Sequence, residues 1–241
     1  MFSTFKMLAV YSTLGPIAGM IGIPYTLMVG DISLLFRVAM WIVAAGLRAG
    51  GIRVEASGQE HVPVGQSCIF MCNHVSNLDP PVVMPSIPGR FAVLLKAELM
   101  RIPILGTAMR MAMFVPVERG GRRDAAQATV ASASEALKAG LHILVYPEGT
   151  RSLDGRLSTF KKGPFFLAMQ TGAPIIPVAI SGTERMMGKG SAWITPGVAT
   201  IQMLEKIDPA AYVTREALMA AVHGAIAAAL PAEMKPGVLV S

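Results

Sequence analysis

SCIFMCNHVSNLDPP, residues 67–81, joins a short apolar run to a polar segment that ends in two prolines. The run at 67–72 has the length of a strand and is almost wholly apolar, as in strands that are buried on both faces. In open α/β sheets, ligands bind beyond the carboxyl ends of the strands. His74 and Asp79 stand in that position. The stretch therefore predicts a buried strand with a candidate site directly after it.

Further apolar runs of strand length lie at 91–96, 112–117, 141–146, 174–180 and 198–204. Segments with helical patterns separate some of them. The segments 122–140 and 162–172 end at Gly140 and Gly172, and a last helix is expected to begin near Thr214. This alternation predicts an α/β fold with a largely parallel central sheet flanked by helices.

The first 50 residues have a different composition. Residues 7–30 contain no formal charge, and as a helix they would be about 36 Å long, enough to cross a bilayer core. Pro16 and Pro24 argue against one straight span, so a kinked span and a helical hairpin dipping into one leaflet fit equally well. A buried helical layer is the alternative. We expect an N-terminal apolar helical membrane anchor over 1–50 and an α/β domain over 51–241.

The whole composition also favours a membrane. Charged residues make up 15% of the chain, the mean hydropathy is +0.53, and the net charge of +6 favours anionic partners. A second apolar stretch covers residues 32–47. Within it, the Arg37 side chain could reach up to the membrane interface and Trp41 could anchor there. With 6% aromatic residues and no basic run interleaved with them, a nucleic-acid partner is not expected.

The two cysteines, Cys68 and Cys72, lie in one predicted strand. Their separation there would be about 13 Å, beyond disulfide reach. We interpret them as reduced core residues. Even with His74 nearby they supply too few ligands to bind a metal, so no metal site is expected.

His74 and Asp79 are five residues apart, which corresponds to about 140° around a helix, so only a loop can bring them together. Asp79 followed by Pro80 is typical of a helix N-cap with proline at the first helical position. In that loop Asp79 could bind one imidazole nitrogen and leave the other as a general base. The spacing alone equally fits a polar loop in which Asp79 only caps a helix.

YPEGTRS, residues 146–152, also follows a strand, and it places a carboxylate, a hydroxyl and a guanidinium in one turn. Arg151 could bind a phosphate, while Glu148 could order the loop or accept from an acceptor hydroxyl. If the strands are neighbours, Lys96, Arg119 and Arg151 could converge on one anion near His74. No protein nucleophile is evident, so the expected chemistry is activation of a substrate hydroxyl.

Four blocks, in this order, resemble the glycerolipid acyltransferases, specifically the bacterial 1-acylglycerol-3-phosphate acyltransferases of the PlsC type. They are NHVSNLD (73–79), MFVPVER (113–119), YPEGTRS (146–152) and APIIPVAI (173–180). The flanking stretches LLKAELMRIPILG (94–106) and FKKGPF (160–165) match as well. The likeness covers residues 53 to 205, and agreement in order and spacing makes it specific.

The resemblance implies transfer of an acyl group from acyl-CoA or acyl carrier protein to a lysophospholipid hydroxyl, without a cofactor. It implies a catalytic pair and two sets of binding residues. His74 is the general base, oriented by Asp79. The acceptor and phosphate set is Lys96, Arg119, Glu148, Gly149, Thr150 and Arg151, and Asn73 and Pro177 shape the pocket.

The apolar N-terminus then resembles the family's anchor, which places the site at the cytoplasmic face of the inner membrane. Tyr146 stands where Phe is common and Glu118 where Asp is common, which leaves acceptor preference open. Lysophosphatidic acid is the expected acceptor, with a lyso-ornithine lipid or another lysophospholipid as the alternative. A non-catalytic anionic-lipid-binding protein and a thioester hydrolase are the rivals from other classes.

Overall fold

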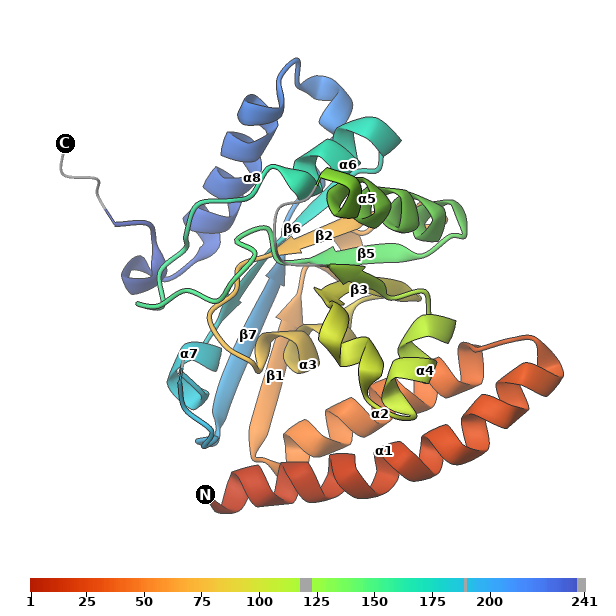
Figure 1. The fold of residues 1–241 in the computed structure, drawn as a ribbon. Coiled ribbons are helices and arrows are strands. Elements are labelled where there is room, and N and C mark those ends of the chain that lie inside the picture. The colour runs from red at the N-terminus through yellow and green to blue at the C-terminus, as the bar shows by residue number, and fades with distance from the viewer. Residues whose placement is uncertain (118–122, 189, 238–241) are drawn as a thin grey trace.

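The computed structural model describes residues 1–117, 123–188 and 190–237. Its centre is a seven-stranded sheet of order β1-β7-β6-β2-β5-β3-β4 (Figure 1). The strands are β1 (Ile52–Ser57), β2 (Ile69–Cys72), β3 (Phe91–Lys96), β4 (Val115–Val117), β5 (His142–Val145), β6 (Ile175–Ser181) and β7 (Gly197–Met203). Neighbours from β6 to β4 are parallel, β7 is antiparallel to β6, and β1 is parallel to β7. The predicted largely parallel sheet is confirmed.

The α-helices flank this sheet. They are α1 (Phe2–Val29), α2 (Ser33–Ala49), α3 (Asp79–Val83), α4 (Leu105–Met111), α5 (Arg123–Lys138), α6 (Gly163–Thr171), α7 (Thr183–Met186) and α8 (Arg215–Ala229). The helices expected at 122–140, at 162–172 and from Thr214 are α5, α6 and α8. α6 ends at a left-handed Gly172, and the Thr214 hydroxyl caps α8 by accepting from the Ala217 N–H. Short 3-10 turns lie at Gln59–His61, Met84–Ser86, Ala97–Arg101, Pro209–Ala211 and Ala232–Met234.

The sheet separates two apolar cores. Alternate side chains of β2 enter opposite cores: Phe70 and Cys72 join one, and Ile69 and Met71 join the other. α2 and α3 contribute to the first core, whereas α5, α6 and α8 cover the second. All four β2 side chains are fully buried, which explains why the run is apolar at every position.

α1 and α2 form a helical hairpin along one edge of the molecule, the lower edge in Figure 1. Gly46 lets the Tyr11 ring approach the α2 backbone, and the Tyr11 hydroxyl donates to the Val43 carbonyl at 3.1 Å. Among the described helices, α1 alone is long and apolar enough to cross a membrane, and 11% of its most apolar window is buried. Leu35, Phe36 and Leu47 of α2 pack into the first core, so α2 attaches the hairpin to the sheet.

β1 was not predicted. The segment at 52–57 was interpreted as the start of the second domain, yet it forms an edge strand paired with β7 along six residues. Its alternation of Ile52, Val54 and Ala56 with polar residues is the period-2 pattern of a half-exposed strand, and that signal was available in the sequence.

Candidate active site

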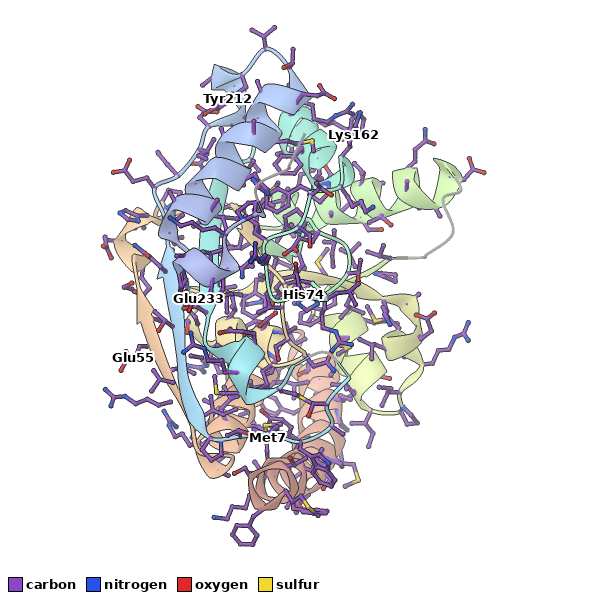
Figure 2. All side chains as sticks on the ribbon, turned by 90° about the vertical axis from the view of Figure 1, so that its left-hand side faces the viewer. Met7, Glu55, His74, Lys162, Tyr212 and Glu233 are labelled. Atoms are coloured by element: carbon purple, nitrogen blue, oxygen red, sulfur yellow. The ribbon has the colours of Figure 1, made fainter. Side chains whose placement is uncertain are left out.

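His74 and Asp79 lie together where β2 ends. The chain leaves β2 at Cys72, turns through a short loop, and enters α3 at Asp79. His74 Nδ1 is 2.8 Å from Asp79 Oδ2, and the two side chains are 18% and 0% exposed. Figure 2 shows His74 between the α1 end of the molecule, marked by Met7, and the opposite end, marked by Tyr212. The predicted fold-back of Asp79 onto His74 is confirmed.

Hydrogen-bond donors surround the buried Asp79 carboxylate. Oδ2 also accepts the backbone N–H groups of Val75 at 2.7 Å and Ser76 at 2.8 Å, and Oδ1 accepts the Thr183 hydroxyl at 2.6 Å. These bonds offset the cost of burying the charge. Because the carboxylate accepts, the imidazole hydrogen is assigned to Nδ1 and the basic lone pair to Nε2. This geometry would allow His74 to act as a general base with Asp79 orienting it.

The expected N-cap role of Asp79 is wrong in detail. Leu78 occupies the cap position of α3, no side chain caps that helix, and Asp79 is its first residue. The carboxylate turns back to the preceding loop instead, since three loop donors and Thr183 occupy it. Pro80 and Pro81 are the second and third residues of the helix, so Pro80 comes one position later than predicted.

A second segment, at the end of β6 and in α7, holds the same loop. The Asn73 amide donates to the Ile180 carbonyl at 2.9 Å and accepts from the Ile180 N–H at 2.7 Å. The Ser76 hydroxyl donates to the Met187 carbonyl at 2.7 Å. Together with Thr183, these contacts fasten both ends of the 73–79 loop to one neighbouring segment. Asn73 is fully buried and acts here by joining β2 to β6.

Tyr146, the first residue of the YPEGTRS segment, stacks on the His74 ring. The ring centroids are 4.3 Å apart, at an interplanar angle of 29°. The Tyr146 hydroxyl is buried and finds no hydrogen-bond partner among the described residues. Burial raises its pKa well above the usual value of 10.0, so the phenol is neutral. The flat contact limits rotation of the imidazole.

Glu148 ties two loops together. Its Oε1 accepts the His74 N–H at 2.6 Å and its Oε2 accepts the Ser158 N–H at 2.9 Å, while the residue is 2% exposed. Burial raises the pKa of this carboxyl, and the two backbone donors partly counter the rise. The Ser152 N–H also donates to the His74 carbonyl at 2.8 Å. Of its two expected roles, the geometry favours ordering of the loop.

The family comparison agrees with this site. The Acyltransferase family profile matches residues 53–181, more than half of the chain and including both loops. This chain belongs to the acyltransferase family. The match begins inside β1 and ends at the last residue of β6, so most of the sheet and the His74–Asp79 dyad lie within it.

Individual relatives of this acyltransferase-family chain share one activity name. It is 35% identical over 143 residues to "1-acyl-sn-glycerol-3-phosphate acyltransferase BAT2, chloroplastic" of Brassica napus, covering 59% of this chain and 41% of the relative. It is 31% identical over 188 residues to a Limnanthes alba 1-acyl-sn-glycerol-3-phosphate acyltransferase, covering 77% and 66%. The human alpha enzyme is 32% identical over 157 residues, covering 65% and 56%. The matches thus span less than two thirds of these relatives.

The fold has a solved counterpart. The crystal structure of the 1-acyl-sn-glycerophosphate (LPA) acyltransferase PlsC from Thermotoga maritima matches with a TM-score of 0.81 at 25% identity. The match covers 93% of this chain and 91% of that chain, so it includes most of the N-terminal hairpin as well as the sheet.

Of the other expected site residues, those at the ends of β3 and β5 lie at the same edge of the sheet as His74. The strand order β2-β5-β3-β4 brings the segments after these four strands into consecutive positions, as the expected convergence requires. Lys96 ends β3 and is exposed, Thr150 is exposed, and Arg151 is half-buried. Gly149 adopts a left-handed φ of 72° in its turn. Arg119 lies outside the described residues.

Pro177 lies within β6, buried and paired with Met71 of β2. Its carbonyl accepts the Leu204 N–H at 2.9 Å, just beyond the antiparallel β6–β7 ladder. A proline is tolerated in this inner strand because the ladder with β7 begins at the next residue, Val178. Its partner Met71 is three residues before His74, so Pro177 lies below the loop that carries His74.

Metal-ligating side chains do not gather anywhere in the described residues: no group of three or more His, Cys, Asp or Glu could hold an ion. Cys68 and Cys72 are both free and buried, as expected for core residues. Burial raises the pKa of both thiols, to about 11 for Cys68, so both are protonated at neutral pH.

Sequence reasoning missed Thr183 and the hydroxyl contact of Ser76. Thr183 is separated from Asp79 by 104 positions, so no local spacing links them. Gly182 immediately precedes Thr183 at a φ of 91°, and a Cβ on Gly182 would collide with the Val198 carbonyl. Glycine is required there by the positive φ and by the close approach of the backbone to β7.

Proposed function

We propose that this protein transfers an acyl group from a thioester to the sn-2 hydroxyl of 1-acylglycerol-3-phosphate, giving phosphatidic acid. The observation that carries the proposal is the His74–Asp79 pair, with Nδ1 held by a buried carboxylate and an imidazole that retains 18% exposure. Support for the acceptor comes from the names of the relatives and of the solved structure with the same fold, which are 1-acylglycerol-3-phosphate acyltransferases.

The reaction needs no covalent enzyme intermediate. His74 Nε2 takes the proton from the acceptor hydroxyl as its oxygen attacks the thioester carbonyl carbon. The tetrahedral intermediate collapses, the C–S bond breaks, and the imidazolium returns the proton to the departing thiolate. Asp79 stabilises the imidazolium, and the four hydrogen bonds to its oxygens hold the carboxylate in place.

Cationic and polar side chains at the sheet edge would bind the acceptor phosphate. The segment after β5, the neighbour of β2, carries Thr150 and Arg151. Lys96 ends β3, the next strand, and Arg119 comes after β4 in sequence. Guanidinium groups bind phosphate oxygens in pairs, which gives orientation as well as affinity. In this proposal Glu148 and Gly149 shape the turn that carries Thr150 and Arg151, while Asn73 and Pro177 shape the pocket floor.

The N-terminal hairpin would hold the enzyme on the cytoplasmic face of the cell inner membrane. The outer face of α1 exposes large apolar side chains along its length, among them Leu8, Ile17, Met20 and Ile21. A bilayer would cover this surface and bring lysolipid to the site. The donor would be acyl-CoA or acyl carrier protein, both of which are soluble in the cytoplasm, and the chemistry requires no cofactor.

An acceptor panel tests the proposal. The purified protein in detergent micelles is supplied with one acyl-CoA and with lysophosphatidic acid, lysophosphatidylcholine or a lyso-ornithine lipid, and acylated product is measured. We expect fastest turnover with lysophosphatidic acid, because its phosphate monoester carries the most charge for the basic edge. Preference for lyso-ornithine lipid would move the activity to another acceptor of the same chemistry.

The same assay separates the other classes. Free fatty acid formed without acylated lipid would indicate a hydrolase, and lipid binding without thioester cleavage would indicate a non-catalytic protein. Repeating the assay with acyl carrier protein as donor distinguishes the two thioesters.

A further inference from the structure

Two segments far apart in sequence meet in an exposed aromatic edge, which we define as Phe2, Phe5 and Trp193. Phe2 and Phe5 lie in the first turns of α1, and Trp193 lies in the segment 190–195 between α7 and β7. The Phe5 and Trp193 ring centroids are 6.1 Å apart, at an interplanar angle of 53°. The three residues are 73%, 58% and 47% exposed. Large rings fixed at the surface indicate a contact with something outside the chain.

The Trp193 segment is held firmly against α1. The Ile194 N–H donates to the Thr4 hydroxyl at 2.8 Å, and both residues are buried, at 3% and 7% exposed. Trp193 itself exchanges hydrogen bonds with Ser191, whose hydroxyl accepts from the Trp193 N–H at 3.0 Å and donates to its carbonyl at 3.1 Å. The indole is therefore presented outward by an ordered segment.

The chemistry of the edge fits the interface of a bilayer. Trp combines a large apolar ring with a polar N–H, and it concentrates at the headgroup level of membranes. Lys6 places its ammonium 4.5 Å from the Phe2 ring centroid, where it can meet lipid phosphate. The edge also continues the exposed apolar face of α1 through Leu8.

The same segment connects to the active-site loop. The Thr195 N–H donates to the Met186 carbonyl at 2.9 Å, and the next carbonyl, that of Met187, accepts the Ser76 hydroxyl. α7, which ends at Met186, begins with Thr183 on Asp79. A lipid contact at Trp193 would thus fix the distance between the loop that carries His74 and the bilayer surface.

We propose that the Trp193 segment is a second membrane contact beside the α1–α2 hairpin, with the indole inserted at the headgroup level of an anionic bilayer. The proposal rests on the membrane association given under the proposed function. It adds a contact from within the α/β domain, more than 140 residues after the end of the hairpin in sequence. Two attachments would fix the tilt of the domain, which one hairpin leaves free to vary.

Single-tryptophan variants test this directly, because the chain has only Trp41 and Trp193. Trp41→Phe leaves Trp193 as the reporter, and Trp193→Phe leaves Trp41 on α2. Each full-length variant is mixed with phosphatidylcholine vesicles containing phosphatidylglycerol, with and without lipids brominated near the headgroup. We expect a blue shift and quenching of Trp193 emission.

Failure of this proposal is distinct from failure of the membrane assignment. Quenching of Trp41 with an unchanged Trp193 spectrum would overturn the second contact while the hairpin remains bound. No vesicle binding by either variant would overturn both.

A partition measurement gives the magnitude. Trp193→Ser should weaken vesicle binding about tenfold, the effect expected when roughly 60 Å² of apolar surface no longer leaves water. Val213→Ser is the matched control, since Val213 is 97% exposed and follows Tyr212, which Figure 2 shows at the opposite end of the molecule from Met7. Its vesicle binding should not change.

Micelle activity of Trp193→Ser, which supplies substrate without a bilayer, should match the parent and shows that the variant is folded. Should it lose activity there, Trp193→Tyr replaces it, with a smaller loss of binding expected. Unchanged vesicle binding, or a change in oligomeric state on sizing with light scattering, would overturn the proposal and assign the edge to a second copy of the chain.

Discussion

Thr183 donates to Oδ1 of Asp79, the oxygen that does not face His74. The bond fixes rotation of the carboxylate, so Thr183 positions the base without touching substrate. It is fully buried, and Gly182 lets the chain approach β7 closely enough to place it. The quality of the base therefore depends on a residue outside the loop that carries His74.

Thr183→Val keeps the side-chain shape and removes the hydroxyl. We expect kcat to fall about tenfold, because one hydrogen bond to a charged group contributes about 1.5 kcal/mol to a correctly oriented base. KM for the acyl donor should change little, and Thr183→Ser should restore most of the rate. Thermal stability is measured in parallel. A lower melting temperature with an unchanged kcat would show that Thr183 is only structural.

Tyr146 combines a useful ring with a costly hydroxyl. Tyr146→Phe removes a buried group that has no described partner and keeps the stack on His74, so the free energy of unfolding should rise by about 1 kcal/mol. Activity should stay within about twofold of the parent, and chemical denaturation with acyl-transfer assays measures both. Tyr146→Ala, which removes the stack, should lose activity. A destabilised Phe variant would mean that the hydroxyl has a stabilising partner.

At the scale of elements, one loop after β2 is held from two sides: by Glu148 from the segment after β5, and by Ile180, Thr183 and Met187 from β6 and α7. Both supporting segments are far from the 73–79 loop in sequence. Parallel neighbours on both sides of β2 create this arrangement, because their carboxyl ends come to the same edge.

The Glu148 contribution should depend on pH. Its folded pKa lies above the usual 4.5, so the unfolded chain releases this proton at lower pH than the fold does. Its stabilising contribution is fully present below about pH 4.5 and is lost as pH rises through the folded pKa. The melting temperature of the parent minus that of Glu148→Gln should therefore decrease from pH 4 towards pH 7. A difference that grows with pH would mean that the backbone donors outweigh the cost of burial.

Much of this arrangement could be predicted from sequence, because it depends on local patterns. The apolar runs marked six of the strands, Gly172 and Thr214 marked helix limits, and ordered blocks brought His74 and Asp79 together. Contacts across the sheet could not be predicted. The pairing of β7 antiparallel to β6, the contact of Thr183 with Asp79 and the engagement of both Glu148 oxygens by backbone groups depend on tertiary neighbours.

At the scale of the whole molecule, the helical hairpin and the dyad belong to one packed unit. α2 side chains share a core with β2, and the α1 N-terminus bonds to the segment that follows α7. In this account the protein is an interfacial enzyme in which a lipid-facing surface and a base are connected by ordered structure. The account requires that His74 performs the proton transfer.

The most direct measurement is therefore the acyl-transfer rate of His74→Ala in micelles, beside the parent and Asp79→Asn. We predict a loss of about 10²-fold or more for His74→Ala, with a retained melting transition and vesicle binding. Asp79→Asn should also be strongly impaired, because an amide would place a donor where the carboxylate now accepts several hydrogen bonds. A folded His74→Ala protein that forms phosphatidic acid at near the parental rate would contradict the account.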